Sequence, residues 1–149
     1  MSRSTLPMLP CMCSSLRRAS RAFTQLYDRA FRPLGLRATQ FTVLQVLSRV
    51  GEVSQGRLGQ MLAMDSTTLT RTLELMARRG WIADRRGQDR RQRWLYLTEA
   101  GKRQLRRAEP PWEKVQMRLR RQFGEQRWRS LMQLSHEAAD RITARGDWI

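Results

Sequence analysis

Acidic side chains are scarce in this chain of 149 residues: 13 aspartates and glutamates stand against 29 lysines and arginines, which leaves a formal net charge of +16. The sequence also has a single histidine, His136, no glycine-rich phosphate loop and no cluster of carboxylates. Acid–base catalysis, hard-metal binding and phosphoryl transfer therefore lack their usual groups. We expect no enzyme, no catalytic residue, no cofactor and no metal, and we interpret His136 as a surface or interface residue.

Long apolar runs are missing as well. No stretch reaches the length that a membrane-spanning helix needs, and the residues around Pro7 and Pro10 do not form a secretory signal. The only two cysteines, Cys11 and Cys13, are too close in sequence for a disulfide between them to stabilise a fold. We expect a cytoplasmic protein with reduced thiols and no membrane partner.

Arginine is the abundant charged residue and accounts for 27 of the 29 basic side chains. Its planar guanidinium can contact phosphate or guanine at two points. A surplus of this size predicts a polyanionic partner, most simply nucleic acid. A GC-rich genome would explain why arginine replaces lysine, but it would not explain the surplus. Because the basic residues are spread along the chain, charge alone does not locate the binding site.

Apolar residues recur at helical spacing through most of the chain. After an arm over residues 1–14, a first helical stretch covers residues 15–36 and ends at Pro33 and Gly35. A second helix is expected from Thr39 to Gly51, apolar nearly all round and therefore buried. Two long helices follow residue 98 and are separated by Gly124. We expect Pro110 and Pro111 to kink the first of these without dividing it.

A tight helix-turn-helix is predicted between these helices. Ser54 and Asp65 are favourable N-caps for two short helices that only residues 63–65 separate. Gly80 suits the left-handed C-cap of the second short helix. That helix carries small hydroxyls and an arginine at its exposed start, where close approach to a major groove is feasible: Ser66, Thr67, Thr70 and Arg71.

A β-hairpin is predicted directly after this helix. Residues 81–84 and 93–97 have strand character, and the basic segment between them contains Gly87. Leu95 and Leu97 should anchor the hairpin to the core, and Thr98 should cap the next helix. The fold class is therefore mainly α with a small β-hairpin, arranged as a winged helix-turn-helix.

The hairpin also carries a family signature. It reads Asp89-x-Arg91, five residues, then Leu97-Thr98-Glu99-Ala100-Gly101. This resembles the wing signature D-x-R-x(5)-L-T of MarR-type (multiple antibiotic resistance) regulators, and the order of helices agrees from about Leu16 to Arg145. The resemblance implies one domain over residues 1–149, with dimerisation helices at 15–36 and 98–146 around a winged helix-turn-helix DNA-binding lobe at 37–97.

The resemblance further implies a homodimeric bacterial transcriptional regulator, a repressor, that binds a pseudo-palindromic operator in double-stranded DNA. Arg91 would enter a minor groove, with Asp89 holding it in one pose. The complete predicted DNA-binding set is Ser54, Gln55, Ser66, Thr67, Thr70, Arg71, Arg85, Arg86, Asp89, Arg91 and Arg93. The alternative is a non-specific architectural DNA- or RNA-binding protein, for which the positive charge would suffice.

Two kinds of signal could release such a regulator from DNA. Cys11 and Cys13 lie just ahead of the first predicted helix and near Arg17 and Arg18, which would raise their thiolate character. In one branch of the family, organic hydroperoxides oxidise a cysteine near this helix. A disulfide between subunits would be less strained than one between two cysteines a single residue apart. A thiophilic metal held across the dimer, or no sensing at all, are the alternatives.

The other signal is a small aromatic or lipophilic effector, since family members often bind aromatic acids or related ligands between the DNA-binding lobe and the dimer helices. Phe23, Tyr27, Trp112 and Met117 are the candidate lining residues. The same residues at helical spacing would also fit a plain core.

Overall fold

The computed structural model describes residues 10–88 and 92–144. Along these residues the elements are α1 (Met12–Phe31), the 3-10 turn η1 (Arg32–Leu34), α2 (Ala38–Val50), β1 (Val53–Ser54), α3 (Gln55–Leu62), α4 (Ser66–Arg78), β2 (Ile82–Arg86), β3 (Arg93–Leu97), α5 (Glu99–Phe123) and α6 (Glu125–Ala144). The predicted class, mainly α with a small antiparallel sheet in a winged-helix arrangement, is confirmed. Nowhere in the described ranges is a helix long and apolar enough to cross a membrane.

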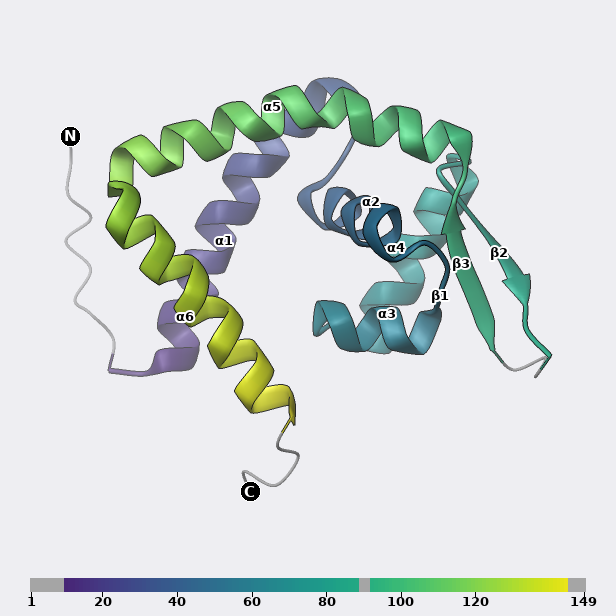
Figure 1. Cartoon of the computed structure of the whole chain (residues 1–149), viewed down its shortest axis with the longest axis horizontal. Helices are drawn as coiled ribbons and strands as arrows, with labels where there is room; N and C mark the ends of the chain where they lie inside the picture. The colour runs from purple at the N-terminus through teal and green to yellow at the C-terminus, as the bar shows by residue number, and fades with distance from the viewer. Residues whose placement is uncertain (1–9, 89–91, 145–149) are drawn as a thin grey trace.

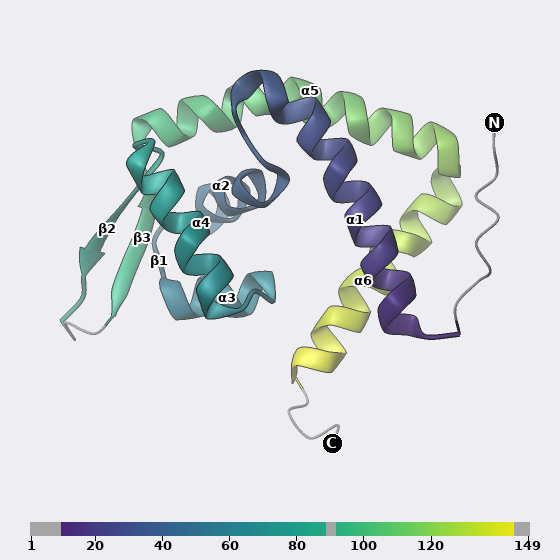
Figure 2. The same cartoon turned by 180° about the vertical axis from the view of Figure 1, so that it is seen from behind.

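Helix α5 forms the upper edge of the molecule and connects two groups of elements (Figure 1). Helix α6 descends from one end of α5, and α1 lies below the same half of α5 with its upper end near the middle, whereas α2, α3, α4 and the sheet lie below the other half, as the view from behind also shows (Figure 2). The larger core lies in the second group, where Leu44, Leu58, Leu73 and Leu95 are completely buried. A smaller cluster of Val115, Leu119 and Trp128 joins α5 to α6 and packs against α1.

Helix α5 runs without interruption through Pro110 and Pro111, as predicted. Each proline removes one backbone donor, and Figure 1 shows the helix curved rather than divided. Gly124, with a φ of +78°, ends α5 and allows the sharp turn into α6.

The sheet has three strands in the order β1-β3-β2, all antiparallel, so the predicted hairpin acquires an additional strand. Strand β1 pairs through Val53 with Leu95 and through Ser54 with Trp94. A strand of two residues has no alternating pattern of its own, so only the tertiary pairing with β3 defines it.

Helix α1 begins at Met12, three residues before the predicted start at Ser15. Its first turn faces solvent, so the apolar periodicity that marks the helix begins only at Leu16 and could not reveal the earlier residues. The correction matters because it places Cys13 inside the first helical turn rather than in the arm.

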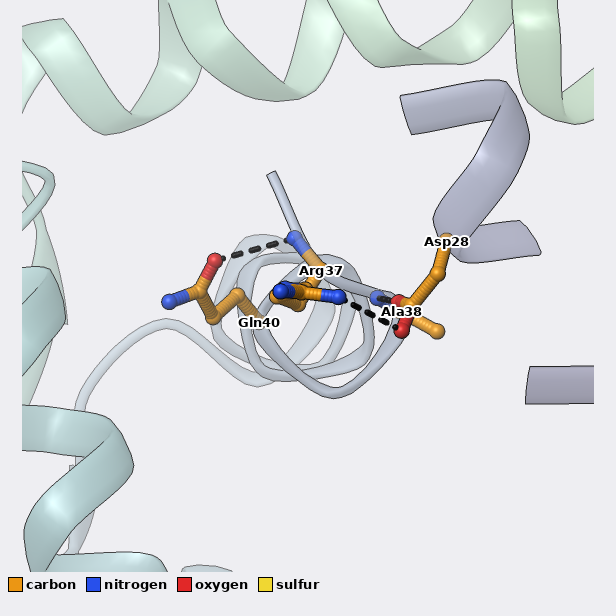
Figure 3. Close-up of polar contacts among 4 residues, drawn as sticks. All are labelled: Asp28, Arg37, Ala38 and Gln40. Carbon is orange, nitrogen blue, oxygen red and sulfur yellow. Dashed lines mark hydrogen bonds and ion pairs between the residues drawn. The ribbon is translucent and has the colours of Figure 1, made fainter. Parts of the chain in front are cut away.

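Helix α2 starts at Ala38, one residue before the predicted Thr39, and its N-terminus is capped from a distance (Figure 3). The N-cap residue is Arg37, whose side chain carries no acceptor. Instead Asp28 of α1 accepts a hydrogen bond from the Ala38 amide through Oδ1 at 2.8 Å and pairs with Arg37 Nη1 through Oδ2 at 3.2 Å. Gln40 Oε1 accepts from the Arg37 amide at 3.0 Å. Asp28 thereby joins α1 to the start of α2.

Replacing Asp28 with alanine should lower the free energy of unfolding by about 1 kcal/mol, the usual cost of losing an N-cap acceptor. Asp28→Asn keeps an oxygen for the Ala38 amide and should retain most of the stability. Urea denaturation at matched protein concentration measures both variants. Equal stability of Asp28→Ala and the wild type would show that the Ala38 amide does not need this cap.

Candidate nucleic-acid interface

Helices α3 and α4 form the predicted helix-turn-helix, and both predicted N-caps are confirmed. Ser54 Oγ accepts from the Arg57 amide at 3.3 Å, and Asp65 Oδ1 accepts from the Thr68 amide at 2.9 Å. Hydrogen bonds from the side chain and backbone of Thr68 hold the pKa of Asp65 below its usual value. Because these groups face their own helix starts, Ser54 and Asp65 orient the two helices.

The exposed start of α4 brings the predicted major-groove residues together. Ser66, Thr67 and Arg71 are exposed and Thr70 is half-buried, while Leu69, Leu73 and Met76 on the opposite side are buried in the core. The four polar residues share a shallow surface hollow with Glu74. Glu74 was missed by sequence reasoning, although it lies at helical spacing from Thr70 and Arg71. Its carboxylate could accept a hydrogen bond from a cytosine amino group.

A side-chain hydrogen bond locks α3 against α4. Gln55 Nε2 donates to Thr70 Oγ1 at 3.1 Å, so two members of the predicted DNA-binding set are paired with each other. Since Gln55 directly follows Ser54, this bond connects the end of β1 to the surface of α4.

The hairpin formed by β2 and β3 carries the remaining predicted residues. Its tip, residues 89–91, lies outside the described residues, so the roles assigned to Asp89 and Arg91 stay predictions. Leu95 is completely buried and Leu97 packs against the core, which confirms the expected anchors. Arg86 is exposed at the end of β2.

Arg85 and Arg93 are both paired with carboxylates of the same chain. Arg85 contacts Glu52 through Nε at 2.5 Å and through Nη2 at 2.7 Å. Arg93 contacts Asp84 through Nε at 2.9 Å and through Nη2 at 3.0 Å. The hydrogen bond from Arg93 lowers the pKa of the Asp84 carboxyl.

The base of the hairpin is joined to α5 at Thr98. The Thr98 amide donates to the Trp81 carbonyl at 3.2 Å, and its hydroxyl donates to the Gly80 carbonyl while accepting from the Gly101 amide at 3.0 Å. The predicted cap is confirmed. A Cβ on Gly101 would lie 1.9 Å from the Trp81 carbonyl oxygen, so the packing here requires glycine.

The two cysteines lie at the exposed start of α1. Cys11 is the N-cap residue, and Arg17 Nη2 approaches Cys13 Sγ at 3.6 Å. Polar groups of Ser14 and the Cys13 backbone lower the pKa of the Cys11 thiol, and the charge of Arg17 contributes further. Tyr27 lies fourteen residues after Cys13 on the same helix, about 21 Å along its axis, and cannot assist either thiol of its own chain.

A cleft of about 820 Å³ opens between α1, α2, α5 and α6, and Phe23, Tyr27 and Trp112 line it. Met117 does not line the cleft. It follows Trp112 by five residues, so its side chain projects from α5 at an angle of about 140° from that of Trp112, and it is 53% exposed. Gln116 Nε2 donates to the Tyr27 hydroxyl at 2.9 Å across the cleft, and burial raises the pKa of Tyr27. Among the described residues that line the cleft, none carries a formal charge.

Comparisons with known proteins agree with this geometry. A sequence model of the MarR family matches residues 34–92, which span the end of η1, α2, β1, the helix-turn-helix and β2, and end just before β3. The transcriptional regulator MosR of M. tuberculosis, solved in complex with DNA, is 37% identical, with 86% of this chain and 96% of that chain covered and a TM-score of 0.75.

More distant relatives share the fold. A mutant MarR of E. coli, solved with operator DNA, is 19% identical, with 92% of this chain and 99% of that chain covered and a TM-score of 0.78. The HTH-type transcriptional regulator YwoH of Bacillus subtilis is 27% identical over 84 residues, which are 56% of this chain and 61% of YwoH, so this alignment spans less than two thirds of that protein.

The relatives are transcriptional regulators rather than enzymes, and the relative with 37% identity was solved on DNA. With that identity extending over nearly the whole of MosR, and with a matching winged-helix structure, the chain belongs to the MarR family of DNA-binding transcriptional regulators.

Proposed function

We propose that the protein is a homodimeric repressor that acts in the bacterial cytoplasm and binds a pseudo-palindromic operator. The start of α4 would enter the major groove through Ser66, Thr67, Thr70 and Arg71. The hairpin would reach an adjacent minor groove through Arg91 and would contact phosphate through Arg86. The main support for this proposal is the hollow at the start of α4, where hydroxyl, guanidinium and carboxylate groups lie together on an exposed helix surface. The N-terminal half of α4, the end of β2 and the start of β3 all lie on the side away from α5 (Figure 2).

A second copy of the chain would cover the apolar side chains that α1, α5 and α6 leave exposed. Met12 is 72% exposed, Leu134 63% and Ile142 60%, and together with Met117 they represent more apolar surface than these helices can bury on their own. Pairing through this surface would present two α4 helices to one DNA face, about 34 Å apart.

Operator binding distinguishes this proposal from the non-specific alternative. A duplex carrying the palindrome upstream of the gene should bind two chains at least about 10³-fold more tightly than a scrambled duplex, and the excess should persist as salt rises. Arg71→Ala should weaken operator binding on the order of tenfold to a hundredfold and reduce the preference for the palindrome.

Arg78→Ala, at the far end of the same helix, provides the control and should bind like the wild type. Fluorescence anisotropy across a salt series measures the affinities, and light scattering measures the mass of the complex. Equal binding to both duplexes would favour the architectural alternative.

Oxidation of the thiols is the first release signal that we propose. The Cys11 or Cys13 thiolate would attack the O–O bond of an organic hydroperoxide, which yields a sulfenic acid and an alcohol. A thiol of the second subunit would then displace water and form an intersubunit disulfide. The lowered pKa of Cys11 and the contact between Arg17 and Cys13 support this route.

Cumene hydroperoxide should release wild-type protein from the operator, and a dithiol reductant should restore binding. Cys11→Ser combined with Cys13→Ser should remain bound under the same treatment, and Arg17→Gln should slow the release. Anisotropy follows the release, and non-reducing electrophoresis detects the cross-linked dimer. Unchanged release of the double cysteine variant would reject thiol sensing.

A neutral aromatic or lipophilic effector in the cleft is the second signal that we propose. Phe23, Tyr27 and Trp112 offer aromatic surface, and the Gln116–Tyr27 bond offers polar groups. Because no cationic side chain lines the cleft within the described residues, a carboxylate bound there would lose its hydration without a partner.

Naphthol should therefore raise the melting temperature and weaken operator binding, whereas the corresponding naphthoate should do neither. Ser20→Trp, which fills the cleft, should abolish the response to naphthol. Thr24 lies on α1 outside the cleft, so the Thr24→Trp variant should still respond to naphthol. A response to naphthoate of the same size would contradict the assignment of a neutral ligand.

A further inference from the structure

The stem of the hairpin is braced on both faces of the sheet. Side chains of neighbouring residues in a strand point to opposite faces, and residues paired across strands share one face. Arg85 is paired in register with Trp94, whereas Arg93 is paired with Arg86, so Arg85 and Arg93 lie on opposite faces. Each guanidinium contacts its carboxylate through two nitrogens, the geometry that best fixes orientation.

The pair on the outer face spans all three strands. Glu52 immediately precedes β1, Arg85 lies on β2, and β3 runs between them. The Arg85 guanidinium also lies 5.9 Å from the centre of the Trp94 ring, and Trp94 is the register partner of Ser54. The pair on the inner face, Asp84 with Arg93, ties β2 diagonally to β3.

The braced sheet is connected directly to the helix-turn-helix. Ser54 ends β1 and caps α3, and the next residue, Gln55, is bonded to Thr70 on α4. The angle of the hairpin is thus linked to the position of α4 by a continuous series of contacts. An unbraced pair of strands would twist freely, and ordering it on DNA would reduce the affinity.

We propose that Glu52, Arg85, Asp84 and Arg93 are positioning residues, whose two ion pairs set the angle of the hairpin to α4 instead of contacting DNA. This inference rests on the proposed operator binding. It assigns the phosphate contact of the described stem to Arg86, which is exposed and forms no ion pair with any described residue. The positioning role also predicts that removing the Glu52 carboxylate weakens operator binding, whereas a DNA contact by Arg85 would predict tighter binding.

Glu52→Gln provides the sharpest test. If Arg85 contacted DNA, removing Glu52 would free a guanidinium and remove a negative charge, so operator binding would tighten. Under the positioning role, Glu52→Gln weakens operator binding on the order of threefold to tenfold in spite of the added positive charge. Arg85→Gln weakens it by a similar factor, and neither variant changes the slope of log affinity against log salt.

Two further variants complete the test. The double variant Glu52→Arg with Arg85→Glu exchanges the two charges. It should recover at least half of the log affinity for operator that the single variants Glu52→Gln and Arg85→Gln lose. Arg86→Gln is the matched control on the same strand: it should weaken operator and scrambled DNA alike and reduce the salt slope by about 0.9, the value for one phosphate. Tighter or unchanged binding by Glu52→Gln, or a reduced salt slope for Arg85→Gln, would overturn the positioning role.

Hydrogen exchange in the free protein separates this inference from the proposed function. Glu52→Gln and Arg85→Gln should speed exchange of the amides in β2 and β3, whereas Arg86→Gln should not. Unchanged exchange in all three variants rejects the brace even where operator binding is specific. Equal binding of the wild type to operator and scrambled DNA rejects the operator proposal, while faster exchange still supports the brace.

Discussion

The joint at Thr98 is the contact on which the arrangement of the two groups of elements depends. One threonine bonds the Gly80 and Trp81 carbonyls between α4 and β2, and it caps α5 through the Gly101 amide. The close approach requires glycine at position 101. Since α5 also carries α6 and packs against α1, the position of the hairpin relative to the proposed dimerisation helices is set at this joint.

Carboxylates are few in this chain, and several of them lie where elements meet. Asp28 caps α2 from α1, Asp65 caps α4, and Glu52 and Asp84 brace the hairpin. In a chain with a formal net charge of +16, each of these acids neutralises a guanidinium or satisfies an amide that would otherwise be unpaired. Exposed arginines outside these pairs, such as Arg71 and Arg86, are then available to a polyanion, which agrees with the DNA-binding family.

Much of the interface was predictable because its signals are local. The caps Ser54, Asp65 and Thr98 act on amides three residues away, so their position before a helical pattern was sufficient. The partners of Arg85 and the strand β1 were not predictable, since both depend on segments more than thirty residues distant in sequence. The error at Met117 has another origin: residue type suggested a cleft, but helical rotation directs the side chain elsewhere.

The amino-acid sequence by itself determined the helices, the caps of α3, α4 and α5, the hairpin, the excess of positive charge and the family, because these follow from spacing and from short motifs. Tertiary structure alone decided which arginines are paired with carboxylates, that Asp28 caps a helix ten residues away, and that no described residue lining the cleft is charged. Each of these depends on the distance between side chains from separate elements, and that distance exists only once the elements have packed.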